Sequence, residues 1–190
     1  TGMGLEALWN NMNEPTSWGH QLPNNLEFFW EGEGATHLQA RNAYGMQMAR
    51  ATREAADEQL EKRPFILTRA GYSGIQRYAT VWTGDNVASD DHMISGVRML
   101  ANMGLAGMPY TGYDVGAFVC ECSPNLFARW LQLGAFSPFF RGHSMVNSRA
   151  SEHWRYEKQY EEISLKHIEI RYEMLPYIMS CMYLAHKTGL

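Results

Sequence analysis

Short apolar runs that alternate with long helical patterns are the feature that most constrains the fold of this chain. Strand-like runs lie at residues 5–9, 64–68, 80–83, 108–111 and 137–140. Helical patterns lie at 36–62, 90–103, 124–133 and 156–187, and Pro176 is expected to bend the last of these. Strands that alternate with crossover helices form a parallel sheet, and nearly continuous apolar runs are typical of its buried strands. The pattern therefore predicts an α/β protein.

Periodicity alone fits an open doubly wound sheet as well as a barrel. Polar residues close to the end of each run favour the barrel, because the carboxyl ends of barrel strands converge on the face that holds the active site. These residues are Asn10, Asn11, Asn13, Glu14, Arg69, Asp85, Asp114, Arg141 and His143. Five strands cannot close an eight-stranded barrel. We therefore expect residues 1–190 to form the C-terminal part of a (β/α)8 TIM barrel, about strands four to eight.

Composition and charge exclude several classes of protein. The 190 residues are 45% hydrophobic and 13% aromatic, which is typical of a globular chain. The net charge of -4 without a basic run argues against a nucleic-acid partner. No apolar segment approaches the roughly 20 residues that span a membrane. Because the chain starts at Thr1, we expect a piece of a longer protein, and neither its compartment nor its oligomeric state is indicated.

The three cysteines do not indicate a metal site or a disulfide framework. Cys120 and Cys122 form a Cys-Glu-Cys pair, but no second pair follows at zinc-finger spacing. With Cys181 the count is odd and sparse, which is atypical of a disulfide-stabilised fold. The interpretation is three free thiols in ordinary packing and no metal.

Four segments stand out in order along the chain: "WNNMNEP", "RPFILTRAGYSGIQRYATVWTGDN", "GLAGMPYTGYDVGAF" and "RWLQLGAFSPFFRGH". Together they resemble glycoside hydrolase family 31, the retaining α-glucosidase family, and the resemblance runs from Trp9 to about Trp154. It implies a (β/α)8 barrel whose first strands and accessory β-domains lie outside this chain. It also implies hydrolysis of terminal, non-reducing α-linked glucose by double displacement, with two carboxyl groups about 5–5.5 Å apart. That mechanism needs no metal or organic cofactor.

The resemblance assigns the acid/base position to Asp85, in "WTGDN". A strand-end aspartate in an aromatic pocket would be desolvated, which favours the protonated form that a general acid needs. The "GDN" triplet is also typical of a turn aspartate with no catalytic role. The residue pattern alone leaves both interpretations open, and the resemblance favours the catalytic one.

Asn11 occupies the position at which family members carry the aspartate nucleophile. An amide has nearly the shape of a carboxylate, but it is uncharged and a far weaker nucleophile. The enzyme is therefore predicted to be disabled. Three explanations remain open: an engineered exchange that traps intact substrate, a naturally inactive relative that binds sugar, or a sequence error or variant rescued in another way. The intact flanking residues favour a single deliberate exchange.

Seven further residues match the family's sugar-binding site. Arg69 resembles an arginine that bonds sugar hydroxyls and the nucleophile, although an arginine paired with Glu or Asp is the commoner arrangement. His143 resembles the histidine beside the anomeric centre. A supporting carboxylate and four apolar walls complete the set: Asp114, Phe118, Trp9, Met12 and Trp82. Such walls suit the C–H faces of a sugar ring. Asn13 and Glu14 are expected to brace the loop.

Two other functions stay open beside hydrolysis. An α-glucosyltransferase of the same family would pass the glucosyl group to another sugar. A non-catalytic carbohydrate-binding homologue would use the same fold without chemistry. In each case the expected partner is an α-linked gluco-oligosaccharide, and the linkage, the chain length and the choice between glucose and another terminal sugar are not indicated.

Overall fold

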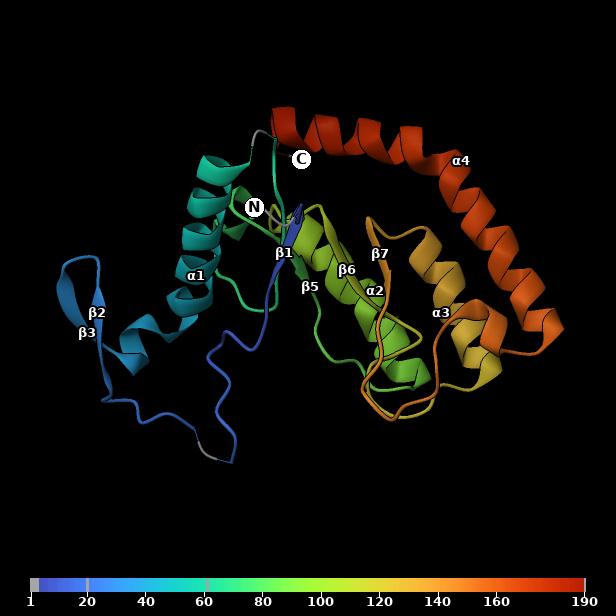
Figure 1. Ribbon diagram of the computed structural model, residues 1–190, viewed down its shortest axis with the longest axis horizontal. Helices are drawn as coiled ribbons and strands as arrows, with labels where there is room; N and C mark the ends of the chain where they lie inside the picture. The colour runs from blue at the N-terminus through green and yellow to red at the C-terminus, as the bar shows by residue number, and fades with distance from the viewer. Residues whose placement is uncertain (1–3, 20, 61, 190) are drawn as a thin grey trace. The chain divides into compact units, whose positions relative to one another are not determined.

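The computed structural model describes residues 4–19, 21–60 and 62–189. It divides into two compact units, Thr1–Val81 and Trp82–Leu190, and most of their helices and strands are labelled in Figure 1. The predicted first helix ran across Glu61, and the predicted start was Thr1; both residues lie outside the described ones. The hydrogen-bonded order of the strands in the larger sheet is β1-β4-β5-β6-β7.

The first unit contains three parallel strands, a hairpin and one long helix. Its elements are β1 (Ala7–Asn10), β2 (Glu27–Trp30), β3 (Glu33–Thr36), α1 (His37–Gln59), β4 (Phe65–Thr68), a 3-10 turn η1 (Ile75–Arg77) and β5 (Thr80–Trp82), which runs into the second unit. β1 pairs in parallel with β4, and Asn10 lies opposite Thr68. β4 pairs in parallel with β5, and Thr68 lies opposite Val81. The predicted parallel strands are confirmed.

The hairpin β2–β3 was not predicted, because the sequence was interpreted as a loop up to Gly34. Trp30 pairs with Glu33, which leaves Glu31 and Gly32 as a two-residue turn. Both turn residues have positive φ, 52° and 94°. This is the combination that a type I′ hairpin requires. Glutamate is an unusual residue at the first of these positions, so the sequence signal for the hairpin was weak.

The second unit alternates helices and strands as predicted. Its elements are α2 (Asp90–Leu105), β6 (Thr111–Val115), α3 (Pro124–Ala135), β7 (Phe139–Gly142), a 3-10 turn η2 (His153–Arg155) and α4 (Lys158–Thr188). β6 and β7 run parallel, with Asp114 opposite Arg141. Both strands begin and end later than predicted. Because of the later ends, Asp114 and Arg141 lie inside their strands and not beyond them.

The ends of α2 and α3 follow simple capping rules. The Ser89 hydroxyl accepts from the His92 N–H at 3.2 Å at the start of α2. The predicted end of this helix at residue 103 is too early, because α2 continues to Leu105. Arg171, on α4, donates to the carbonyls of Ala135 at 3.1 Å and Pro138 at 2.7 Å, and it also donates to that of Ser137. A cation at the C-terminus of α3 satisfies carbonyls that the helix itself leaves open.

The core of the second unit forms between β6 and the helices that follow it. Trp130 is fully buried and meets Tyr113 edge-on at 6.3 Å between ring centroids. Phe127 stacks on Tyr156 at 4.2 Å. The α4 helix is continuous through Pro176, and Figure 1 shows it changing direction along its length, as the proline predicted. This packing fixes the strand ends that carry the candidate site.

Candidate functional site

Three predicted site residues lie at the end of β1. Trp9 and Met12 are 44% and 40% exposed, and Asn11 between them is also exposed. Met12 has a φ of 55°, in the left-handed region that non-glycine residues rarely adopt. Such conformations persist only where neighbouring contacts hold them. The backbone therefore turns sharply directly after Asn11.

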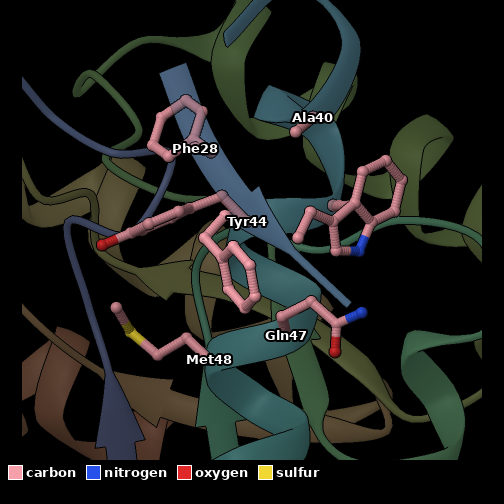
Figure 2. Close-up of a pocket in the computed structure, with 8 residues that line it drawn as sticks. Phe28, Ala40, Tyr44, Gln47 and Met48 are labelled. Carbon is pink, nitrogen blue, oxygen red and sulfur yellow. The ribbon is translucent and has the colours of Figure 1, made fainter. Parts of the chain in front are cut away.

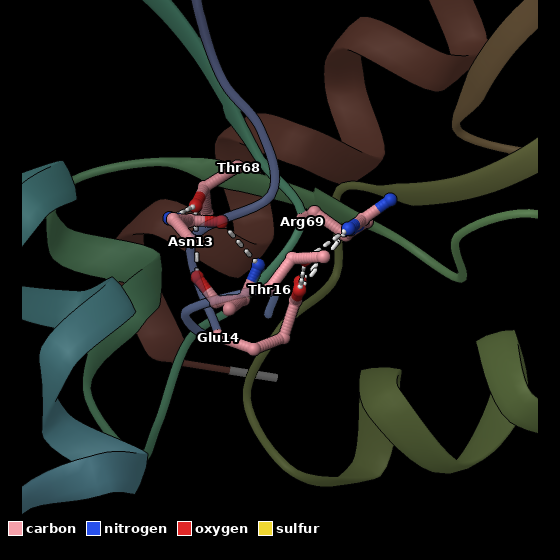
Figure 3. Close-up of polar contacts among 6 residues, drawn as sticks. Asn13, Glu14, Thr16, Thr68 and Arg69 are labelled. Carbon is pink, nitrogen blue, oxygen red and sulfur yellow. Dashed lines mark hydrogen bonds and ion pairs between the residues drawn. The ribbon is translucent and has the colours of Figure 1, made fainter. Parts of the chain in front are cut away.

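Asn13 supplies the contact that holds this turn, as Figure 3 shows. Its side chain is fully buried; Nδ2 donates to the Thr68 hydroxyl at 2.9 Å, and Oδ1 accepts from the Ala70 N–H at 3.1 Å. The Thr68 hydroxyl in turn donates to the Ala70 carbonyl at 2.8 Å. A buried amide with both ends satisfied fixes the loop after β1 to the loop after β4. The bracing role expected of Asn13 is confirmed.

Arg69 follows β4 and forms a two-pronged ion pair with Glu14. Its Nε lies 2.8 Å from Glu14 Oε1 and its Nη2 lies 3.0 Å from Oε2 (Figure 3). Nη2 also donates to the Thr16 hydroxyl at 2.8 Å. The guanidinium holds the pKa of Glu14 below its usual value. Bidentate geometry fixes the plane of the guanidinium. Sequence reasoning placed Arg69 correctly but did not identify Glu14 as its partner.

In the second unit, Trp82 and Asp85 stand in contrasting surroundings. Trp82 is 2% exposed, whereas Asp85 is exposed. The burial expected for Asp85 is therefore not found in this chain, because the turn at Gly84, with a φ of 80°, carries the next residue outward. The ring of Trp82, predicted as an apolar wall of the sugar site, is buried in this chain.

Asn86, which sequence reasoning missed, joins the loop after β5 to the loop after β6. Its backbone carbonyl accepts from the N–H groups of both Phe118 and Val119 at 2.9 Å. Its side-chain oxygen accepts from the Thr83 hydroxyl at 3.3 Å. Ala88 then donates to the Val119 carbonyl at 3.0 Å. The loop that bears Asp85 is thus bonded to the neighbouring loop at Asn86 and again at Ala88.

Asp114 is fully buried in β6 and pairs with Arg141 on β7. Arg141 Nη2 lies 2.6 Å from Asp114 Oδ1. Burial raises the pKa of Asp114 to about 6, the guanidinium opposes that rise, and the charge of Asp85 adds to it. Arg141 also lies over the Trp82 ring, 5.1 Å from its centroid. Sequence reasoning grouped Arg141 with the strand-end residues but gave it no role.

Phe118 and His143, which were each predicted for the sugar site, lie side by side. Their rings stack with centroids 4.9 Å apart and an interplanar angle of 22°. Burial, with the nearby charge of Arg141, lowers the pKa of His143, and Asp85 acts in the opposite direction. Near neutral pH a lowered pKa keeps the imidazole uncharged. A neutral imidazole both donates and accepts hydrogen bonds, which suits a sugar hydroxyl.

A separate pocket of about 370 Å³ lies in the first unit, shown in Figure 2. The hairpin and α1 line it with the residues Phe28, Phe29, Trp30, Ala40, Ala43, Tyr44, Gln47 and Met48. None of the predicted site residues lines this pocket. Over residues 4–19, 21–60 and 62–189, no group of His, Cys, Asp and Glu is arranged to hold a metal ion. Within the same residues, no helix combines the length and the apolar character of a membrane span.

Parallel strands that alternate with helices and carry polar side chains at their carboxyl ends are the arrangement of (β/α)8-barrel enzymes. The chain belongs to glycoside hydrolase family 31, because residues 1–181 match the family model of the glycosyl hydrolases family 31 TIM-barrel domain. It is thus part of the TIM-barrel domain of a glycoside hydrolase.

The names of similar proteins are consistent with this family. The chain is 41% identical over its whole length to "Alpha-glucosidase 2" of Bacillus thermoamyloliquefaciens. It superimposes on a glucosidase II alpha subunit in its Glc1Man2-bound form with a TM-score of 0.85, at 33% identity over 95% of the chain. A family 31 alpha-glucosidase from Bacteroides thetaiotaomicron gives 0.84, at 37% identity over 98%. The chain spans 24%, 20% and 30% of the lengths of these proteins.

Proposed function

We propose that this chain carries the catalytic positions of a retaining α-glucosidase and that Asn11 disables it. The observation that supports the proposal most directly is positional. Asn11 and Asp85 are exposed in the loops that follow the carboxyl ends of β1 and β5, where barrel enzymes carry their reacting groups. The substrate is an oligosaccharide with a terminal, non-reducing α-linked glucose, in keeping with relatives named α-glucosidases.

The proposed chemistry is a double displacement. An aspartate at position 11 attacks the anomeric carbon and forms a glycosyl ester, while Asp85 gives its proton to the departing oxygen. Asp85 then takes a proton from water, which attacks the same carbon and releases glucose with its configuration retained. The amide of Asn11 has no negative charge with which to attack or to stabilise the oxocarbenium-like transition state. The first displacement therefore does not occur.

Supporting residues have roles that follow from their contacts. Arg69, held in one plane by Glu14, presents its guanidinium to sugar hydroxyls and to the nucleophile position. Phe118 and His143 form a stacked pair for the ring and its hydroxyls. The apolar surfaces of Trp9 and Met12 would cover the C–H faces of the sugar.

The test uses the complete parent protein with Asn11 and with Asn11→Asp. Glucose release from maltose and isomaltose is expected to rise by several orders of magnitude with aspartate, since a missing nucleophile removes most of the catalysis. Proton NMR of the first product should show the α-anomer. Asn10→Asp is the matched control: Asn10 is half-buried and its amide lies 3.1 Å from the Thr52 hydroxyl, so a carboxylate there should not restore activity.

Other outcomes of this experiment point elsewhere. If transfer products dominate at low substrate concentration, the protein is an α-glucosyltransferase and not a hydrolase. If both proteins bind the sugar and neither cleaves it, the enzyme proposal is overturned and a carbohydrate-binding homologue takes its place.

A further inference from the structure

Arg141 contacts two neighbouring strands of the second unit at once. From β7 it bonds Asp114 on β6 at 2.6 Å, and its Cζ lies 5.1 Å from the centroid of Trp82, the last residue of β5. We call these three residues the strand-end clasp. Asp114 is fully buried and Trp82 is 2% exposed, so the clasp is held in the interior. A guanidinium that pairs with a carboxylate and also lies over an indole ring is held by two contacts at once.

The clasp adjoins the loop that carries Asp85. Trp82 is three residues before Asp85, and the Thr83 N–H donates to the Gly112 carbonyl of β6 at 3.0 Å. The Asp114 N–H points to the side-chain oxygen of Asn86, 3.4 Å away. Both residues next to the Asp85 turn are therefore bonded to the strand that Arg141 holds. A shift of β6 relative to β7 would be transmitted to Asp85.

Charge ties the clasp to the same loop. The charges of Arg141 and Asp85 act in opposite directions on the pKa of Asp114, and they also act in opposite directions on that of His143. A single guanidinium thus favours the ionised form of Asp114 and the neutral form of His143. Lysine cannot reproduce the planar contact with Trp82 and the bond to Asp114 together.

We propose that Arg141 is a positioning residue that sets the geometry of the acid/base loop by joining Asp114 to Trp82. This proposal rests on the proposed function, since it gives the loop of Asp85 its purpose. Arg141 acts through its neighbours and is not itself a reacting group.

The clasp is tested first in the complete parent protein with Asn11 in place, where no activity is needed. In Arg141→Met, hydrogen exchange at the amides of Ala88, Phe118 and Val119, which pair across the two loops, should be faster by about tenfold or more. Arg129→Met is the matched control, because Arg129 forms an exposed pair with Asp90 at 2.5 Å on the same unit. Unchanged exchange at the three amides in Arg141→Met would overturn the clasp.

The effect on catalysis is measured in the Asn11→Asp background. Arg141→Met should lower kcat for maltose about 100-fold, as expected when a reacting group is misplaced by about 1 Å. KM should change far less, because the sugar contacts remain. Arg141→Lys should recover only part of kcat. A loss confined to KM would make Arg141 a substrate-binding residue and would contradict the proposal.

A double-mutant cycle decides whether Arg141 and Asp114 act as one unit. If they do, Asp114→Asn with Arg141→Met should be no slower than the worse of the single variants. Effects that multiply would show independent roles and would overturn the clasp. If Asn11→Asp is itself inert, the proposed function fails, and the exchange experiment still decides whether Arg141 holds the loop.

Discussion

At the scale of single residues, Asp114 links the stability of this chain to pH. Its pKa is raised from 3.8 to about 6 by burial, which corresponds to ~3 kcal/mol. Between about pH 4 and 6 the folded protein holds a proton that the unfolded chain has lost. The free energy of unfolding should therefore fall as the pH rises through this window, and the loss should be complete above it.

Asp114→Asn isolates this effect. The amide oxygen still accepts from Arg141, but position 114 no longer carries a titratable charge. The free energy of unfolding is measured in urea for both forms of the complete parent protein at pH 4 and at pH 7. The difference between variant and unsubstituted protein should rise by ~3 kcal/mol from the lower to the higher pH, since all other groups titrate in both proteins. A difference in stability that does not change with pH would show that Asp114 is not the titrating group.

The sequence predicted which residues lie near strand ends but not what they touch. A polar residue that follows an apolar run is visible in the sequence, so Asn11, Arg69, Asp85 and His143 were placed well. Ion pairs are not visible in this way. Glu14 and Arg69 are 55 positions apart and meet only because β1 and β4 are paired.

The pair of Asp114 and Arg141 was hidden by an error of strand boundaries. The apolar run at 108–111 suggested that the strand ends before Asp114, whereas β6 continues to Val115. A carboxylate inside a buried strand contradicts the usual apolar pattern. It becomes understandable only when Arg141 is known to lie opposite it on β7.

At the scale of elements, the contact between β6 and β7 depends on Gly112. A Cβ at this position would meet the backbone carbonyl of Phe139 on β7 well inside van der Waals contact. Backbone cannot move aside as a flexible side chain can. Gly112→Ala should therefore lower the free energy of unfolding by at least ~1–3 kcal/mol.

Gly104→Ala is the matched control for this prediction. Gly104 lies in α2, and nothing among the described residues lies within 4 Å of the place that an added Cβ would take. Alanine there should raise stability by about 0.5–1 kcal/mol, because glycine weakens a helix. Urea midpoints of the two variants of the parent protein give the comparison. Equal effects of the two substitutions would contradict the packing argument for β6.

Elements were easier to predict than their boundaries. Parallel strands and crossover helices follow from the alternation of patterns, and all of these elements were found. The hairpin β2–β3 was missed because its turn, Glu31 and Gly32, lacks the Asn or Asp that usually marks such turns. The late starts of β6 and β7 have a similar origin, since strand ends are set by pairing with a neighbour and not by local sequence.

At the scale of the whole molecule, α4 presents a large apolar surface. Tyr172, Tyr177, Met179 and Tyr183 are 59–70% exposed. Exposed apolar side chains of this size bind other protein or promote aggregation. Expressed alone, the 190-residue chain should bind the dye ANS and unfold with little cooperativity. A complete family 31 enzyme is the comparison, and a chain that unfolds as sharply and binds as little dye would contradict this expectation.

The backbone carbonyl of Asn86, which accepts two hydrogen bonds, has a consequence for engineering. It fastens two loops with one atom, so the loops after β5 and β6 form a single exchangeable module. A library that randomises residues 116–122 alone will mostly detach the partner loop and yield poorly folded clones. Libraries that transplant residues 83–89 and 116–122 together from one donor protein keep the shared carbonyl and the two amides that donate to it. New specificities should be sought in such paired grafts.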